Sequence, residues 1–177
     1  MFKKLIKGLF VLSTLIMLNC PAANAFYTDM DQNHWAYQSI KFLTEVGVVV
    51  GYPDGTYKPD IPVTRAEFAS MAIKALGQED ANVTQDIHFT DVKPDFWAYN
   101  IIKKAVYFDL IPDSKEADFR PYDSVTRAEA ITIAVNALTT SQISEQRAQD
   151  IIAKSYEDYT QMPAWFLISA AKAQLLD

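Results

Sequence analysis

The sequence repeats itself at a fixed interval. The pentad Val-Thr-Arg-Ala-Glu occupies residues 63–67 and again residues 125–129, which is 62 residues later and needs no gap. Other residues of the first copy are also identical to those 62 positions later, namely Thr28, Asp29, Trp35, Ala36, Tyr37, Ile40, Lys41, Pro59, Ala72, Ala75 and Leu76. This pattern is typical of a chain built from a repeated structural unit, so each residue has to be interpreted within its repeat.

Residues 1–25 have the layout of a secretory signal peptide. Three lysines form a basic start, residues 9–18 are apolar apart from a Ser and a Thr, and Ala-Asn-Ala at 23–25 offers a small-x-small cleavage site. The apolar stretch is too short and wrongly flanked to span a membrane, and no later segment is apolar for long enough. We therefore expect an exported protein that begins at Phe26.

Cys20 is the only cysteine, so the exported part of the chain is expected to have no disulfide and to depend on packing for its stability. The Leu-Asn-Cys sequence at 18–20 raises a second possibility, in which Cys20 is acylated and becomes the N-terminus of a lipoprotein. Asn19 fits that site poorly, because a small residue normally stands there. Ordinary cleavage before Phe26 is the favoured prediction, with lipidation as the alternative.

The chain is acidic, with 16 basic and 22 acidic residues, and loss of the three leader lysines takes its formal net charge from −6 to −9. Nucleic acids and anionic lipid surfaces require a positive face on their partner, so neither is an expected partner. A small anionic ligand held by a few arginines remains compatible with this charge. The 10 Phe, 9 Tyr and 3 Trp indicate a packed core rather than a disordered chain.

Each repeat is predicted to fold as helix, loop, helix, which makes the fold mostly α. We place the first unit at 26–80, the second at 86–140 and an incomplete third unit at 141–177. The third unit contains only the opening half, with a helix expected after Ser141 or Ser144. If the missing half leaves part of the bundle unfilled, Leu138 and the surroundings of Trp165 are exposed and are covered by a partner or by self-association. The favoured prediction is that the opening helices of the third unit shield the first two and leave a compact monomer, because that unit ends on a helical segment and the negative charge opposes self-packing.

The first half of each unit has helical spacing of apolar residues, and Asp31 or Asn33 and Asp95 are the expected N-caps. In the first unit, residues 51–59 then form a loop. Its Pro-Asp-Gly sequence predicts a turn, because proline presets φ and glycine permits a positive φ.

The second half of each unit begins with a capping box. Thr64 with Glu67, and Thr126 with Glu129, have the T-x-x-E spacing in which the two residues satisfy each other's backbone amides. We assign these four residues a structural capping role. The apolar face expected behind each box comprises Phe68, Met71, Ala72, Ala75 and Leu76 in the first unit and Ile131, Ala134, Val135 and Leu138 in the second.

These motifs resemble the S-layer homology (SLH) domain, whose features are an Asp before a Trp-Ala helix, a Gly-Tyr-Pro-Asp-Gly-Thr-aromatic-x-Pro loop and a Thr-Arg-Ala-Glu helix start. The first unit carries them at Asp29, 35–36, 51–59 and 64–67. The second unit keeps the Asp, the Trp-Ala pair and the pentad, but it reads Ser-Lys-Glu-Ala-Asp at 114–118, without the glycines.

The resemblance implies three modules around a pseudo-threefold axis, with the third one incomplete here. It implies an exported module of the cell wall or envelope, periplasmic or at the cell surface according to wall type. Such modules bind wall-linked polysaccharide, in some cases pyruvylated, or peptidoglycan-associated glycan. A second reading is a structural protein that pairs with other SLH-containing envelope proteins and binds no glycan.

The resemblance also implies ligand contacts, chiefly by the pentad arginines. The candidate ligand-binding residues are Arg65, Arg127, Trp35, Trp97, Asp54 and Gly55. A helix N-terminus favours anions, and a guanidinium there can bind a carboxylate in bidentate fashion. The alternative for each arginine is a salt bridge to a carboxylate of the neighbouring unit. Because only the first unit keeps its glycine loop, we expect Arg65→Ala to weaken wall binding more than Arg127→Ala, with little effect of either on stability.

Trp35, Trp97 and Trp165 are expected in the core, since large aromatic side chains are mostly buried. Stacking of an exposed indole on a sugar ring is the alternative.

No catalytic or metal-binding motif stands out. His34 and His88 have no motif partner, and Asp54 and Asp60 lack the ligand count and spacing of an EF-hand. A hidden pair of catalytic carboxylates, as in glycosidases, stays open, but nothing selects one. A binding module without cofactor or metal, and not an enzyme, is the predicted class.

Overall fold

The computed structural model describes residues 26–111, 117–139 and 142–176. Within these residues the chain forms α-helices, one short 3-10 helix and no β-strand. The helices are α1 (Tyr37–Glu45), α2 (Arg65–Ala75), α3 (Tyr99–Tyr107), α4 (Arg127–Leu138), α5 (Glu145–Ser155), η1 (Tyr159–Gln161) and α6 (Ala164–Gln174). The mostly α prediction is confirmed. The signal peptide and most of the altered 114–118 loop lie outside the described residues.

Side-chain caps start the pentad helices and the additional helix α5. Thr64 accepts a hydrogen bond from the Glu67 amide, and the Glu67 carboxylate accepts from the Thr64 amide, so the capping box of α2 is closed. The box of α4 is closed in the same way. Ser144, one of the two residues expected to precede the third-unit helix, caps α5 by accepting from the Arg147 amide at 3.3 Å. These contacts satisfy amides that the helix itself leaves without acceptors.

The opening helices begin later than the sequence suggested. The N-cap positions of α1 and α3 are Ala36 and Ala98, and neither has a side-chain cap. The prediction of Asp31, Asn33 and Asp95 as caps is therefore wrong. Asp31 instead accepts from the Asn33 amide at 2.7 Å, in a turn that precedes the helix, because short Asp side chains readily bond their own backbone two residues on.

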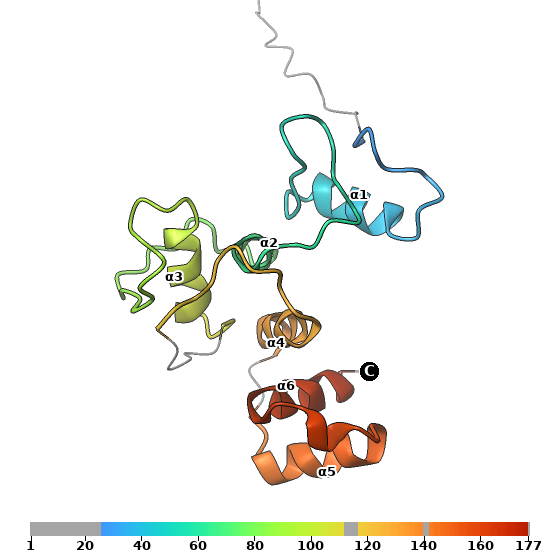
Figure 1. The fold of residues 1–177 in the computed structure, drawn as a ribbon, viewed down its shortest axis with the longest axis vertical. Coiled ribbons are helices and arrows are strands. Elements are labelled where there is room, and N and C mark those ends of the chain that lie inside the picture. Colours follow the sequence, from blue (N-terminus) through green and yellow to red (C-terminus); the bar gives the residue numbers. More distant parts are fainter. Residues whose placement is uncertain (1–25, 112–116, 140–141, 177) are drawn as a thin grey trace, which may run out of the picture.

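Each pentad helix packs against a helix of the next unit. Helix α2 packs against α3 and also touches α4, and α4 packs against α6 (Figure 1). Ala66, Ala69 and Ile73 of α2 share one hydrophobic cluster with Ile102 and Ala105 of α3. The largest core therefore crosses the boundary between the two sequence repeats and ties them together.

Burial on the pentad helices differs in part from the predicted face. Ala75 and Ala134 were placed on the apolar face but are exposed, whereas Ala66, Ala69 and Ile73 are buried. The reason is that α2 faces two partners, α3 and α4, so its buried surface is set by tertiary packing rather than by one amphipathic stripe.

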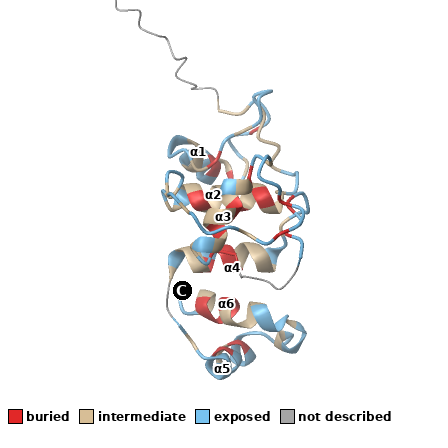
Figure 2. Cartoon of the chain, turned by 90° about the vertical axis from the view of Figure 1, so that its left-hand side faces the viewer, coloured by how far each residue is buried: buried red, intermediate tan, exposed pale blue. Residues whose placement is uncertain are grey.

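The C-terminal part forms a second, smaller core between α5 and α6. Figure 2 shows buried residues gathered there and, separately, around α2 and α3. Ala148 and Ile152 of α5 meet Ala170 and Ala171 of α6. Leu138 at the end of α4 is exposed, which agrees with the less favoured of the two readings of the third unit. The described residues contain two pentad helices, α2 and α4, and the pseudo-threefold arrangement stays a prediction.

The first opening helix lies apart from the main core. Helix α1 buries Ile40 in a small cluster with Met30, Ala36 and aromatic rings from its own unit. Among the described residues, no helix is long and apolar enough to cross a membrane.

Candidate functional site

The Arg65 side chain is bound by the second repeat. Its Nε donates to the Phe119 carbonyl at 2.8 Å, and its guanidinium lies 4.8 Å from the centre of the Phe119 ring. Its Nη1 forms an ion pair with Oε1 of Glu129. The two charged side chains are only 14% and 20% exposed, so this pair is shielded from most of the solvent. The structure thus places Arg65 in the inter-repeat salt bridge that the sequence left open as an alternative.

The first amides of α2 are also occupied by the second repeat. The Arg65 amide donates to the Asp123 carbonyl at 2.9 Å, and the Ala66 amide donates to the Pro121 carbonyl at 3.1 Å. In return the Val125 amide donates to the Val63 carbonyl at 2.9 Å, next to an isolated antiparallel bridge. Peptide carbonyls therefore take the place that an anion would occupy at this helix N-terminus.

Arg127 is in a different situation, although it has the same place in its pentad. Its side chain is exposed, and the described part of the chain gives it no ion pair or hydrogen bond. Of the two predicted arginines, Arg127 is the one whose guanidinium is open to a ligand.

The glycine loop of the first unit is held by its own residues. The Gly55 amide donates to the Tyr52 carbonyl at 2.9 Å, and Gly55 has a φ of +81°, which closes the predicted turn. Hydrogen bonds from Thr56 lower the pKa of the Asp54 carboxyl. Asp54 also pairs with Lys58 at 3.3 Å, and the Lys58 ammonium lies 4.1 Å from the centre of the Tyr52 ring. The Asp54 carboxylate therefore binds groups of its own loop and stabilises the loop conformation.

Two aspartates have a role that the sequence analysis missed. Asp29 accepts hydrogen bonds from the Tyr57 and Lys58 amides at 2.8 and 2.7 Å. The bond from the Tyr57 amide is the main reason why the pKa of the Asp29 carboxyl lies below its usual range. Asp91 accepts from the Phe119 and Arg120 amides at the same two distances. Each aspartate therefore joins the opening of its unit to the end of its loop.

These bonds hold an unusual backbone. Lys58 and Arg120 each follow the aromatic residue of their loop and have φ values of +60° and +58°. Residues other than glycine rarely adopt this left-handed backbone conformation. The signal was available in the sequence, because the Asp and the aromatic-x-Pro segment repeat together at the 62-residue offset.

The tryptophans are at the surface, not in the core. Trp35 is 90% exposed and Trp97 is 56% exposed, and Trp165 is also exposed. The prediction of core packing is wrong for all three. Each ring precedes or begins its helix, and the neighbouring alanine enters the core instead, as Ala36 and Ala98 show. The exposed indoles fit the other reading, in which their faces are available to a sugar.

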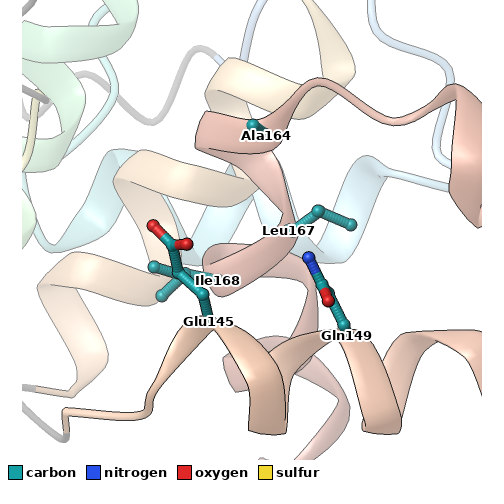
Figure 3. Close-up of a pocket in the computed structure, with 5 residues that line it drawn as sticks. All are labelled: Glu145, Gln149, Ala164, Leu167 and Ile168. Carbon is teal, nitrogen blue, oxygen red and sulfur yellow. The ribbon is translucent and has the colours of Figure 1, made fainter.

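A small hollow among the described residues includes none of the candidate ligand-binding residues. It lies between α5 and α6 and is lined by Glu145, Gln149, Ala164, Leu167 and Ile168 (Figure 3). Its volume of about 30 Å³ suits a few water molecules and not a sugar ring. Among the described residues, no group of three or more His, Cys, Asp or Glu side chains could hold a metal ion.

Comparison with known families agrees with the repeat geometry. The model of the S-layer homology domain matches residues 26–69 and residues 88–131. Each match starts before the opening aspartate and ends within a pentad helix, α2 or α4. The chain is an S-layer homology domain protein. Its two SLH segments contain both loop-anchoring aspartates, both capping boxes and both pentad arginines.

Several relatives with SLH segments are much longer proteins. The chain is 36% identical over 120 residues to Cell surface glycoprotein 1 of Acetivibrio thermocellus, which covers 63% of this chain and 5% of that protein. It is 34% identical over 115 residues to the Cellulosome-anchoring protein of the same organism, covering 63% of this chain and 26% of that one. An Endoglucanase of Bacillus sp. is 31% identical over 169 residues, which is 86% of this chain and 18% of the enzyme. This chain therefore spans only about a quarter or less of the length of these relatives.

Proposed function

We propose that this protein is an exported anchoring module of the cell envelope, which binds wall-linked polysaccharide or peptidoglycan-associated glycan without covalent attachment. The observation that carries the proposal is the exposure of Trp35 and Trp97. These two indoles stand at the same position of successive repeats and remain in solvent, although burial of a tryptophan is strongly favourable. An exposed, amphipathic ring on each unit suits stacking against the apolar face of a sugar.

The arginines have different parts in this proposal. Arg127 presents an open guanidinium to an acidic group of the glycan. Arg65 acts indirectly, since its pairing with Glu129 fixes the first repeat against the second. Asp54 and Gly55 give the 51–59 loop its shape, beside Thr28, whose amide donates to the Gly55 carbonyl at 3.0 Å.

The names of relatives support a role in the envelope. They include a Cellulosome-anchoring protein, a Middle cell wall protein of Brevibacillus brevis and a Surface layer protein of Brevibacillus choshinensis. The acidic charge of the chain fits a carbohydrate partner better than a nucleic acid.

The proposal is tested by sedimentation of the purified protein with cell wall that has been stripped of all protein. Pelleting with the wall, and release by soluble wall polysaccharide, is the expected result. A protein that stays in the supernatant would favour the other reading, in which the SLH units pair with those of other envelope proteins and no glycan is bound.

A further inference from the structure

The contact between the two repeats has a donor side and an acceptor side. The donor side is the start of α2, where the Arg65 side chain and the Arg65 and Ala66 amides give hydrogen bonds. The acceptor side belongs to the second repeat and consists of the carbonyls of Phe119, Pro121 and Asp123 with the carboxylate of Glu129. Every position on both sides has an equivalent 62 residues away in the other repeat.

Each side has a second copy in the chain because the repeat offset is constant. The donor residues correspond to Arg127 and Ala128 at the start of α4. The acceptor residues correspond to Tyr57, Pro59, Ile61 and Glu67 in the first unit. In the described part of the chain, no donor reaches the carbonyls of Tyr57, Pro59 and Ile61, and the Arg127 and Ala128 amides have no acceptor.

The unused acceptor end has the same local structure as the occupied one. Asp29 holds the backbone after Tyr57 as Asp91 holds that after Phe119, with equal distances and matching positive φ values. The next turn is also shared: the Ile61 amide donates to the Lys58 carbonyl at 3.0 Å, and its counterpart spans 3.2 Å. The carbonyls that receive Arg65 therefore have equivalents whose backbone is shaped in the same way.

The carboxylates of Glu67 and Glu129 differ in what binds their second oxygen. In both capping boxes, Oε2 accepts from the N-cap amide, at 2.9 Å in Glu67 and 2.8 Å in Glu129. In Glu129 the other oxygen, Oε1, pairs with Arg65. Oε1 of Glu67 has no partner among the described residues, and neither has the guanidinium of Arg127. One chain thus carries an open cation on its second repeat and an open carboxylate on its first, on either side of the one contact of this kind that the described residues form.

We propose that a second copy of this chain docks its first-repeat acceptor end, centred on Glu67 and residues 57–61, onto Arg127 and the start of α4. The contact continues the intramolecular interface with the same chemical groups. It is heterologous, because the surface used on one copy differs from that used on the other. Each dimer keeps one open donor end and one open acceptor end, so larger assemblies form as concentration rises.

The acidic net charge, which favoured a monomer in the sequence analysis, opposes this association at long range. At the contact itself the charges are opposite and the donors and acceptors are matched, and the association therefore depends on the pair rather than on net charge. A wall glycan that reaches Arg127 would compete for the same residue. The association is for this reason measured without wall material.

Analytical ultracentrifugation of the protein, expressed from the full sequence, over a concentration series tests the proposal with two variants. Arg127→Ala removes the donor end and keeps the acceptor end. Glu67→Gln weakens the acceptor end and keeps the capping box, since Gln serves at N3 as well as Glu. Arg147→Ala, at another exposed arginine, is the matched control.

The wild type and the control are expected to associate with rising concentration, and each variant alone to associate about tenfold more weakly. An equimolar mixture of the two variants should form dimers as readily as the wild type, because each supplies the end that the other lacks. A wild type that is monomeric at every concentration would overturn the proposal and leave a different chain or a glycan as the occupant. Variants that associate as the wild type does, or a mixture that fails to recover, would equally overturn it.

Discussion

Arg65 at the start of α2 and Glu129 in the first turn of α4 form an ion pair between residues 64 positions apart. The same carboxylate closes the capping box of α4 through its other oxygen. One glutamate therefore begins its own helix and binds the preceding repeat. This double use gives a physical reason for the Arg of the first pentad and the Glu of the second.

The ion pair predicts a loss of stability when Arg65 is removed. Arg65→Ala should lower the free energy of unfolding by about 2 kcal/mol, because a charged hydrogen bond is lost and Glu129 is left half-buried without its partner. Arg127→Ala should change it by less than about 0.5 kcal/mol, as is usual at an exposed site. The measurement is denaturant unfolding. This outcome would differ from the sequence-based expectation that neither arginine matters for stability.

A double-mutant cycle isolates the pair. Glu129→Gln keeps the capping box, so combining it with Arg65→Ala should show a coupling energy of about 0.5–3 kcal/mol. Strict additivity of the two substitutions would mean that the pair contributes nothing to joining the repeats.

Asp29 predicts a dependence of loop stability on pH. Hydrogen bonds from the Tyr57 and Lys58 amides lower the pKa of its carboxyl in the folded state. The stabilisation is therefore present above the unfolded pKa of about 3.9 and is lost as pH falls through the folded value. The wild type should melt at a higher temperature than Asp29→Asn near neutral pH, and this advantage should shrink below about pH 3.9.

Asp60→Asn, at an exposed aspartate nearby, controls for general effects of charge. A melting difference between the wild type and Asp29→Asn that stays constant down to acid pH would argue against the carboxylate as the holding group.

Gly51 predicts a steric requirement in the same loop. A Cβ added there would overlap Cε1 of Tyr27 and lie 2.6 Å from the Thr56 carbonyl oxygen. Tyr27 cannot easily withdraw, since its ring packs against Tyr57 and its hydroxyl hydrogen-bonds Thr44. Gly51→Ala should destabilise the protein by about 1–3 kcal/mol in thermal or denaturant unfolding. An unchanged melting temperature would show that the loop accommodates the methyl group by moving.

The sequence repeat made the local structure of each unit predictable, but not the contacts between units. The T-x-x-E spacing located the starts of α2 and α4, because a capping box is a local interaction readable within four residues. The pairing of Arg65 with Glu129 was open, since a salt bridge between units depends on how the units pack. Periodicity within one helix does not contain that information.

The exposed tryptophans show the same limit. Because large aromatic side chains are usually buried, Trp35 and Trp97 were expected in the core. The chain instead buries the adjacent alanines and leaves the indoles in solvent. The burial of a side chain depends on which other segment of the chain packs against it, and the sequence of one unit does not show this. The roles of Asp29 and Asp91 were in principle predictable, because each recurs with its loop segment at the repeat offset.

The leader predicts the N-terminus of the exported protein. Cleavage after the Ala-Asn-Ala site should leave Phe26 as the first residue, without a lipid. Intact mass spectrometry of the protein purified from its native envelope checks this. A mass that corresponds to acylated Cys20 would instead establish a membrane-tethered lipoprotein.

Binding of wall glycan by the exposed tryptophans is tested most directly by the affinity of tryptophan variants for protein-free cell wall. Trp35→Ala and Trp97→Ala should each bind about tenfold more weakly, and the double variant more weakly still, with helix content unchanged by circular dichroism. Phe42→Ala, at an exposed aromatic residue in α1, should bind as the wild type does. Wild-type binding by the double tryptophan variant would show that the two indoles do not bind the wall.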